Sequence, residues 1–236
     1  MSAEIEVIED PMERTAQLIA SAAGHGGHIA LTGGSTPKTA YARAAAIGGK
    51  WSRLHLWFGD ERCVPPTDER SNFAMAKAAL LGRITGSPPD VERIEGELGP
   101  DAGAAAYEAR LHEVFGEGMP ALDLILLGLG SDGHCASLFP GKPALDETER
   151  LVVGVPEAGL EPFVPRVTFT LPLINAAREV VFLVSGADKA PAVARAFSGE
   201  PDPATPASLV APASGTLRVL LDPAAAAQLP PEVVRA

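Results

Sequence analysis

The chain has 236 residues, of which 46% are hydrophobic and 21% charged, a composition typical of a globular protein rather than a disordered one. Its formal net charge of −11 argues against binding nucleic acid or an anionic membrane through a general field, because both partners need a basic surface. Two cysteines, an acidic start without signal-peptide features and the lack of a membrane-length apolar run argue against a disulfide scaffold, secretion and membrane insertion, and favour the cytoplasm.

Short apolar runs and helical patterns alternate along the whole sequence. Strands are predicted over residues 5–8, 28–31, 54–58, 91–94, 122–127, 151–155, 167–171, 179–185 and 217–221. Helices are predicted over residues 11–23, 38–46, 73–81, 101–115 and 189–197. No internal repeat is visible. This order is typical of an α/β protein with a mainly parallel sheet, and we expect one domain over residues 1–236.

Polar residues follow three of the predicted strands, at residues 32–36, 60–62 and 130–134. Ligands of open parallel sheets bind beyond the carboxyl ends of the strands. We therefore expect these three clusters to converge on one rim and to form the functional site.

Residues 128–133, Gly-Leu-Gly-Ser-Asp-Gly, match the glycine pattern of dinucleotide-binding sites directly after a strand. That pattern should open a long helix, whereas Pro140 leaves room for only about two helical turns. The acidic residues at 146–149 also precede the next strand instead of ending it. We therefore expect no nicotinamide cofactor, and attribute the glycines to a sharp turn beside a ligand.

His134 follows this turn, and Asp132 is placed to orient its ring and raise its basicity. The other four histidines show no metal-ligand spacing, so no metal site is expected. No G-x-S-x-G elbow supports a nucleophilic serine. Cys135 is interpreted as a small filler residue rather than a thiolate nucleophile.

Two further clusters suit an anion. Residues 32–37 include Gly34, Ser35 and Thr36 between a strand and a helix, so their amides and hydroxyls can face a phosphate, although an ordinary capped turn is the alternative. Residues 60–62, Asp-Glu-Arg, are either a solvated charge cluster or a site where Arg62 holds an anionic or carbonyl oxygen. Arg166 and Lys189 are additional cations that could meet a phosphate, or lie on the surface.

Taken together and in this order, these segments resemble the glucosamine-6-phosphate isomerase/6-phosphogluconolactonase family over nearly all of the chain. The resemblance is carried by residues 31–37, 59–65, 71–73, 128–141, 166–168 and 189–190. It implies a three-layer α/β/α fold with a Rossmann-like sheet, similar to glucosamine-6-phosphate deaminases and ribose-5-phosphate isomerases.

Among the activities of this family, the residues favour the lactonase. The related deaminases usually carry a catalytic acid shortly after the histidine, where this chain has Ser137-Leu138-Phe139-Pro140, and tend to have tyrosine in place of Arg62. The family more often has threonine at the position of Cys135. The implied reaction is hydrolysis of 6-phospho-D-glucono-1,5-lactone to 6-phosphogluconate in the oxidative pentose phosphate pathway, without metal or organic cofactor. A deaminase or isomerase, and a non-catalytic sugar-phosphate sensor, are the alternatives.

Our mechanistic hypothesis assigns roles to individual residues. His134 would act as general base with help from Asp132, and Arg62 with turn amides would stabilise the oxyanion. The residues expected to bind the substrate are Gly34, Ser35, Thr36, Asp60, Asn72, Arg166 and Lys189, with the 6-phosphate held by Ser35, Thr36, Lys189 and Arg166. The expected partner is a small sugar phosphate alone, and the expected state is a monomer or a small homo-oligomer.

Overall fold

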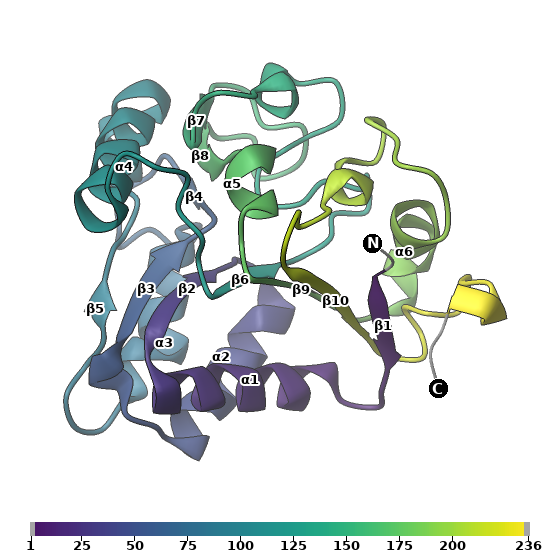
Figure 1. Cartoon of the computed structure of the whole chain (residues 1–236), viewed down its shortest axis with the longest axis horizontal. Helices are drawn as coiled ribbons and strands as arrows, with labels where there is room; N and C mark the ends of the chain where they lie inside the picture. Colours follow the sequence, from purple (N-terminus) through teal and green to yellow (C-terminus); the bar gives the residue numbers. More distant parts are fainter. Residues whose placement is uncertain (1–2, 234–236) are drawn as a thin grey trace.

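The computed structural model describes residues 3–233, which are built around a parallel β-sheet (Figure 1). In spatial order its strands are β1 (Glu4–Val7), β10 (Thr216–Leu221), β9 (Glu179–Val184), β6 (Leu124–Leu127), β2 (Gly27–Leu31), β3 (Leu54–Phe58) and β5 (Asp90–Val91). Every neighbouring pair in this sheet is parallel. The α/β class and the parallel sheet predicted from the sequence are therefore confirmed.

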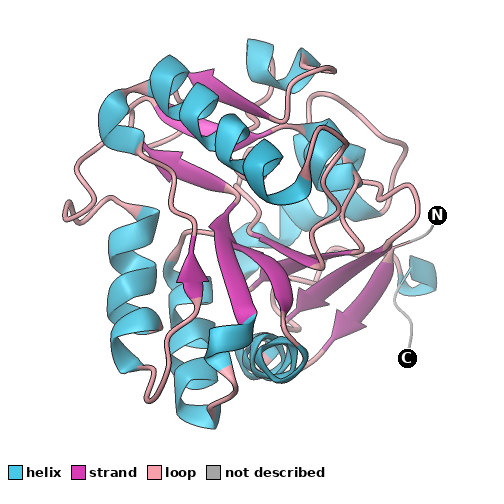
Figure 2. Cartoon of the chain, turned by 60° about the vertical axis from the view of Figure 1, so that its left-hand side comes forward, coloured by secondary structure: helices cyan, strands magenta, loops and turns pink. Residues whose placement is uncertain are grey.

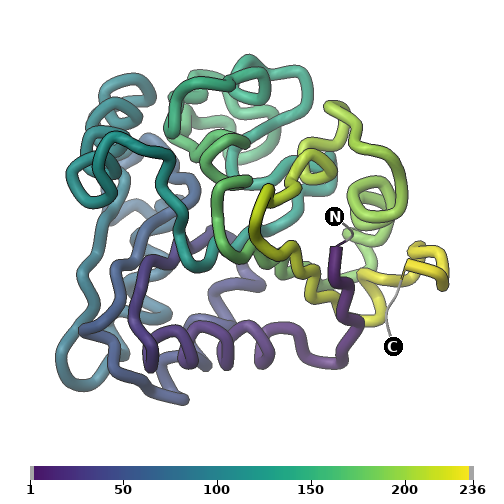
Figure 3. The backbone as a smooth tube through the Cα atoms, viewed as in Figure 1, coloured from purple at the N-terminus to yellow at the C-terminus, as the bar shows by residue number. Residues whose placement is uncertain are grey.

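Helices cover both faces of the sheet (Figure 2). They are α1 (Pro11–His25), α2 (Ser35–Ile47), α3 (Asn72–Ala79), α4 (Pro100–Phe115), α5 (Leu171–Asn175) and α6 (Ala190–Phe197). In Figure 1, α1 and α2 lie on one side of the sheet, and α4 and α5 lie on the other. At one edge of the sheet the first strand of the chain, β1, pairs with β10, which lies near the other end of the sequence (Figure 3).

Local sequence accounts for the ends of the first helix. Asp10 accepts a hydrogen bond from the Glu13 N–H at 3.0 Å, and Pro11 takes the first helical position, where its missing N–H costs nothing. Gly26, with φ 88°, ends the helix in a conformation that favours glycine. Ala16, Ile19 and other small or aliphatic residues on one face are fully buried against the sheet.

The structure contains a second, three-stranded antiparallel sheet, whereas we expected the strands in these regions to continue the parallel sheet. Residues 60–62 form a strand, β4 (Asp60–Arg62), which pairs antiparallel with β8 (Arg166–Phe169), and β8 pairs antiparallel with β7 (Val152–Val155). Gly59 joins the two sheets, because its N–H donates to the Leu31 carbonyl and its own carbonyl accepts from the Phe169 N–H. The polar residues of β4 thus belong to a strand and not to a loop.

Two boundaries also differ from the prediction. The strand expected to reach residue 171 ends at Phe169, and Thr170 precedes the unpredicted short helix α5. The strand expected near 91–94 is reduced to the two residues of β5 at the sheet edge. Within residues 3–233, no helix has the length and apolar character needed to cross a membrane.

Candidate active site

The turn after β6 carries His134 and Asp132 at the carboxyl end of the parallel sheet. All four residues of β6 are buried, which fixes the strand in the core. Residues 131–142 then form turns instead of the long helix that a dinucleotide site requires. The Gly130 N–H donates to the His134 carbonyl at 2.8 Å, so the turn closes on itself and displays the histidine.

Asp132 and His134 form a close pair. The Asp132 Oδ1 lies 2.6 Å from the His134 Nδ1 and also accepts from the His134 main-chain N–H at 3.1 Å. Partial burial disfavours the Asp132 charge, but the hydrogen bonds and charge of His134 outweigh it, so the pKa of Asp132 lies below its ordinary value. A charged carboxylate at Nδ1 requires the hydrogen on that nitrogen, so in a neutral ring Nε2 is the nitrogen that can accept a proton.

Gly130 makes room for this pair. A Cβ atom on Gly130 would lie 2.0 Å from the His134 Nδ1 and 2.5 Å from the Asp132 Oδ1, distances that real Cβ contacts do not show. The requirement for glycine here is therefore steric and comes from the neighbouring side chains. The backbone of Gly130 itself does not demand it, because its φ lies outside the left-handed region.

The C-terminal part of the chain holds the same turn from outside. The Arg195 guanidinium on α6 donates to the Ser131 carbonyl at 2.9 Å, and the Ala207 N–H donates to the Gly133 carbonyl at 3.0 Å. Gly133 has φ +94° and packs against Thr205 so closely that a Cβ would lie 2.8 Å from its methyl group. Nothing in the sequence pattern predicted these supports.

Asp60, on β4, links three segments beneath the site. Its carboxylate accepts from the Ser137 Oγ at 2.7 Å and from the Asn72 Nδ2 at 3.1 Å, and it lies 4.0 Å from the Arg166 Nη1. Asp60 is only 5% exposed, so these partners replace the water it has lost.

Glu61 points away from the site and caps α3. It accepts hydrogen bonds from the Ser71 hydroxyl and from the main-chain N–H groups of Arg62, Asn72 and Phe73, all between 2.7 and 2.9 Å. Burial raises the pKa of Glu61 above its ordinary value in spite of these donors. Of the two acids in the predicted cluster, Asp60 alone faces the pocket.

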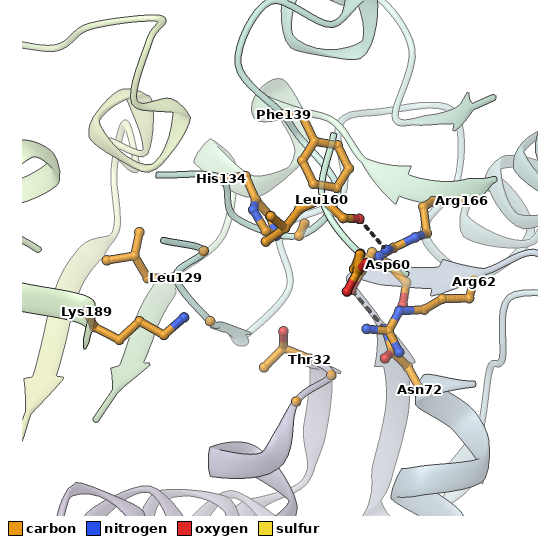
Figure 4. Close-up of a pocket in the computed structure, with 16 residues that line it drawn as sticks. Thr32, Asp60, Arg62, Asn72, Leu129, His134, Phe139, Leu160, Arg166 and Lys189 are labelled. Carbon is orange, nitrogen blue, oxygen red and sulfur yellow. Dashed lines mark hydrogen bonds and ion pairs between the residues drawn. The ribbon is translucent and has the colours of Figure 1, made fainter. Parts of the chain in front are cut away.

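Two arginines lie on the same side of the pocket as Asp60 (Figure 4). Arg62 donates from Nη1 to the Arg70 carbonyl, and its buried Nε has no hydrogen-bond partner within residues 3–233. Arg166 donates from Nη2 to the Pro162 carbonyl at 2.8 Å and the Leu160 carbonyl at 3.4 Å. Burial lowers the pKa of the Arg166 guanidinium, although nearby Asp60 opposes this.

Lys189 approaches the pocket from the opposite side (Figure 4). It ends the 3-10 turn Ala187–Lys189 between β9 and α6. Asp222, at the end of β10, fixes the entry to this turn by accepting from the Ser185 Oγ and from the Gly186 N–H at 3.0 Å. His134 and Thr32 lie between the cations, and face each other across the opening.

These segments enclose a pocket of about 260 Å³. The predicted residues that line it are Gly34, Asp60, Arg62, Asn72, His134, Arg166 and Lys189. Asp132 supports His134 from behind, whereas Ser35 and Thr36 begin α2 and are not among the lining residues. Leu160 and Glu161 also line the pocket and belong to no predicted motif, whereas Thr32, Leu129 and Phe139 belong to predicted motifs but were not named as binding residues. No group of three or more His, Cys, Asp or Glu side chains within residues 3–233 is arranged to hold a metal ion.

Comparison with known proteins identifies the family. A family model described as glucosamine-6-phosphate isomerases/6-phosphogluconolactonase matches residues 3–219. The chain belongs to this family. The membership agrees with the resemblance found in the sequence segments that build the pocket.

Several proteins similar to this chain are named 6-phosphogluconolactonase. A 6-phosphogluconolactonase of Nostoc is 42% identical over 206 residues, covering 85% of this chain and 84% of the relative. One from Mycobacterium leprae is 40% identical over 248 residues, covering 98% and 100%. The solved 6-phosphogluconolactonase of Trypanosoma cruzi superposes with a TM-score of 0.82 at 31% identity, covering 96% and 97%. A monomeric glucosamine-6-phosphate deaminase, 20% identical with a TM-score of 0.78, shares the fold.

Asp222 provides a test of how this family member holds the Lys189 turn. Burial opposes its charge, but the Ser185 hydroxyl and nearby N–H groups hold the pKa of Asp222 below its ordinary value of 3.8. The charge therefore stabilises the fold above the unfolded pKa, and this stabilisation is lost as the pH falls through the folded pKa. We expect Asp222→Asn to lower the free energy of unfolding by about 1–2 kcal/mol at pH 7.

Thermal unfolding of both proteins between pH 7 and pH 2.5 measures this difference. The difference in stability should narrow towards acid pH, because the stabilisation by the Asp222 charge begins to fall below the unfolded pKa and is lost as the pH falls through the folded pKa. A difference in stability between the two proteins that stays constant over this pH range would show that the charge of Asp222 does not contribute.

Proposed function

We propose that the chain hydrolyses 6-phospho-D-glucono-1,5-lactone to 6-phospho-D-gluconate in the oxidative pentose phosphate pathway. The observation that carries the proposal is the base His134, oriented by Asp132 at 2.6 Å, in a pocket that also presents three cations. Such a pocket suits an anionic substrate in a protein whose net charge is −11. The relatives at about 40% identity named 6-phosphogluconolactonase support the same reaction.

In this proposal His134 acts on water. Its Nε2 takes a proton from a water molecule as the water oxygen attacks the lactone carbonyl carbon. The carbonyl oxygen becomes an oxyanion, which Arg62 and main-chain N–H groups of the turn stabilise. When the bond between this carbon and the ring oxygen breaks, His134 returns the proton to the ring oxygen, and 6-phosphogluconate leaves. Asp132 holds the imidazole in the required tautomer throughout.

The 6-phosphate would bind at the start of α2 and at Lys189. Gly34 caps this helix without a side-chain hydrogen bond, so its first N–H groups, including those of Ser35 and Thr36, suit an anion. Arg166 is another cation that could bind the phosphate. Asp60 lies 4.0 Å from its guanidinium and is itself hydrogen-bonded by Asn72. Binding energy from the phosphate would then place the lactone carbonyl beside His134.

The residues after His134 favour hydrolysis over deamination. Ser137, Leu138 and Phe139 are all buried, and the Ser137 hydroxyl donates to Asp60. This segment therefore packs into the core and offers no carboxylate where the related deaminases usually have one. An acid for proton transfer to a leaving amine would have to come from elsewhere.

Turnover of freshly generated 6-phosphogluconolactone, corrected for spontaneous hydrolysis, tests the proposal. We expect catalysed hydrolysis without added metal or cofactor, and no ammonia release from glucosamine 6-phosphate. Ammonia release would replace the proposal with a deaminase. Binding of either sugar phosphate without turnover would replace it with a sensor.

Lys189→Ala should raise the KM for 6-phosphogluconolactone by about 10-fold or more while changing kcat much less, because loss of a charge-assisted contact costs about 1.5–3 kcal/mol. Steady-state kinetics measure both parameters. Lys142→Ala is the matched control, since Lys142 pairs with Glu157 outside this pocket. An unchanged KM for Lys189→Ala would remove Lys189 from the phosphate site.

We place the protein in the cytoplasm, where cysteines are kept reduced. Cys63 and Cys135 are both free thiols, and burial raises their pKa to about 11 and about 12 respectively. Thiols with such values stay protonated at neutral pH, which suits a filler role. A monomer or small homo-oligomer remains our prediction for the assembly.

A further inference from the structure

Thr32 lies in the pocket, and the mechanism proposed above gives it no role. It follows β2, is 6% exposed and lines the pocket. In Figure 4 its side chain points into the opening between Lys189 on one side and Asn72 and Asp60 on the other, opposite His134. Its hydroxyl makes no hydrogen bond within the part of the chain that the structure describes, residues 3–233, whereas both of its main-chain polar groups are bonded.

The partner of those main-chain groups is one buried hydroxyl. Tyr41, on α2, has no exposed surface, and its Oη accepts from the Thr32 N–H at 2.9 Å and donates to the Thr32 carbonyl at 2.8 Å. A single side chain thus satisfies the backbone on both sides of the Thr32 side chain. Helix α2 thereby holds the residue at the end of β2 in one orientation.

The next residue is fixed from the other direction. A Cβ atom on Gly33 would lie 2.0 Å from the Asn72 Oδ1, so the backbone there packs directly against the Asn72 amide. That amide is oriented by its Nδ2, which donates to the Asp60 carbonyl and carboxylate. The backbone carrying Thr32 is therefore held between Tyr41 and Asn72, and its side chain is preorganised toward the pocket.

We propose that the Thr32 hydroxyl binds a ring hydroxyl of the lactone, and that Tyr41 is the positioning residue that presents it. The inference rests on the proposed function. The phosphate is drawn to a cationic side of the pocket, so the neutral ring is left for the middle, where Thr32 faces His134. A threonine hydroxyl both donates and accepts, as a sugar hydroxyl does, which makes the two groups complementary.

Thr32→Val and Thr32→Ser separate the hydroxyl from the shape of the side chain. Valine keeps the β-branch and removes the hydroxyl, and it should lower kcat/KM for 6-phosphogluconolactone by about 3- to 10-fold, the effect of one neutral hydrogen bond. Serine keeps the hydroxyl and should stay within about twofold of the wild type. The inhibition constant of inorganic phosphate should be the same for Thr32→Val and the wild type.

Two results would overturn the role of Thr32. Equal kcat/KM for Thr32→Val and wild type would show that the hydroxyl is not used. A weaker inhibition by inorganic phosphate would assign the hydroxyl to the phosphate instead of the ring. If the wild type itself fails to hydrolyse the lactone, the proposed function is what fails.

Tyr41→Phe tests positioning, and Tyr107→Phe is its matched control. Tyr107 is also buried, and its hydroxyl likewise accepts from one main-chain N–H, of Phe58, and donates to one carbonyl, of Glu92, each at 2.9 Å. Both variants should lose stability in urea unfolding. Only Tyr41→Phe should also lower kcat/KM, by about 3- to 10-fold.

A double variant decides whether Tyr41 acts through Thr32. If it does, Tyr41→Phe combined with Thr32→Val should lose no more kcat/KM than Thr32→Val alone. Multiplicative losses in the double variant, or equal kcat/KM for the Tyr41 and Tyr107 variants, would show that the Tyr41 hydroxyl supports the fold only.

Discussion

His134→Gln should lower kcat for 6-phosphogluconolactone hydrolysis by about 10²- to 10⁴-fold, the usual contribution of a positioned general base. Glutamine keeps a polar side chain of similar length but cannot take a proton from water at neutral pH. The substitution removes the whole imidazole, and with it both Nε2 and the Nδ1 that contacts Asp132. A rapid assay with fresh lactone, corrected for the uncatalysed reaction, measures the loss.

His112→Gln is the control for this variant. His112 lies in the last turn of α4, and its Nδ1 contacts the Gly116 carbonyl outside the pocket. Its activity should equal that of the wild type. If His134→Gln retains more than about a tenth of the wild-type kcat, another group is the base and the mechanism proposed above is wrong.

Gly130→Ala should also lower kcat strongly, although it replaces no catalytic side chain. The added methyl group would overlap the His134 Nδ1 at 2.0 Å and the Asp132 Oδ1 at 2.5 Å, so the imidazole and the carboxylate have to separate. Without that hydrogen bond the ring loses its orientation and its fixed tautomer. We expect kcat to fall by about 10²-fold or more, since acid–base catalysis depends on hydrogen-bond reach.

Gly118→Ala controls for the cost of alanine in a loop of the same chain. A Cβ on Gly118 would meet nothing within 4 Å, and its φ lies outside the left-handed region. Both alanine variants should give wild-type circular dichroism, which separates a distorted site from a misfolded protein. A fully active Gly130→Ala would mean that the turn relaxes and that the observed pair is not required.

The sequence was most informative about the parallel sheet. Strand β6 and the last three residues of β2, β3, β9 and β10 are apolar and buried, and such runs stand out from the loops between them. Local patterns cannot reveal pairing between distant strands. The antiparallel partnership of β4 with β8 joins residues 60–62 to residues 166–168, and no turn signal connects them.

The site was predictable where a motif places several polar residues at a strand end. The residues 60–62 and 130–134 were found in this way, and the structure brings Asp60, Arg62 and His134 together around one pocket. Supports that come from far along the chain, such as Arg195 beneath Ser131, have no local signal. Leu160 and Glu161 were missed because they lie in a loop without a recognisable motif, and Thr32, although part of the predicted cluster 32–36, was given no role of its own.

The pairing of β1 with β10 has a consequence for how the protein is made. Within residues 3–233, β1 has one neighbour in the sheet, β10, which is synthesised about 200 residues later. During synthesis the exposed edge of β1 has no native partner, and the inner strands can associate before it does. Closure of this edge must therefore wait until β10 has been synthesised, so it is expected to be a late step in the assembly of the sheet.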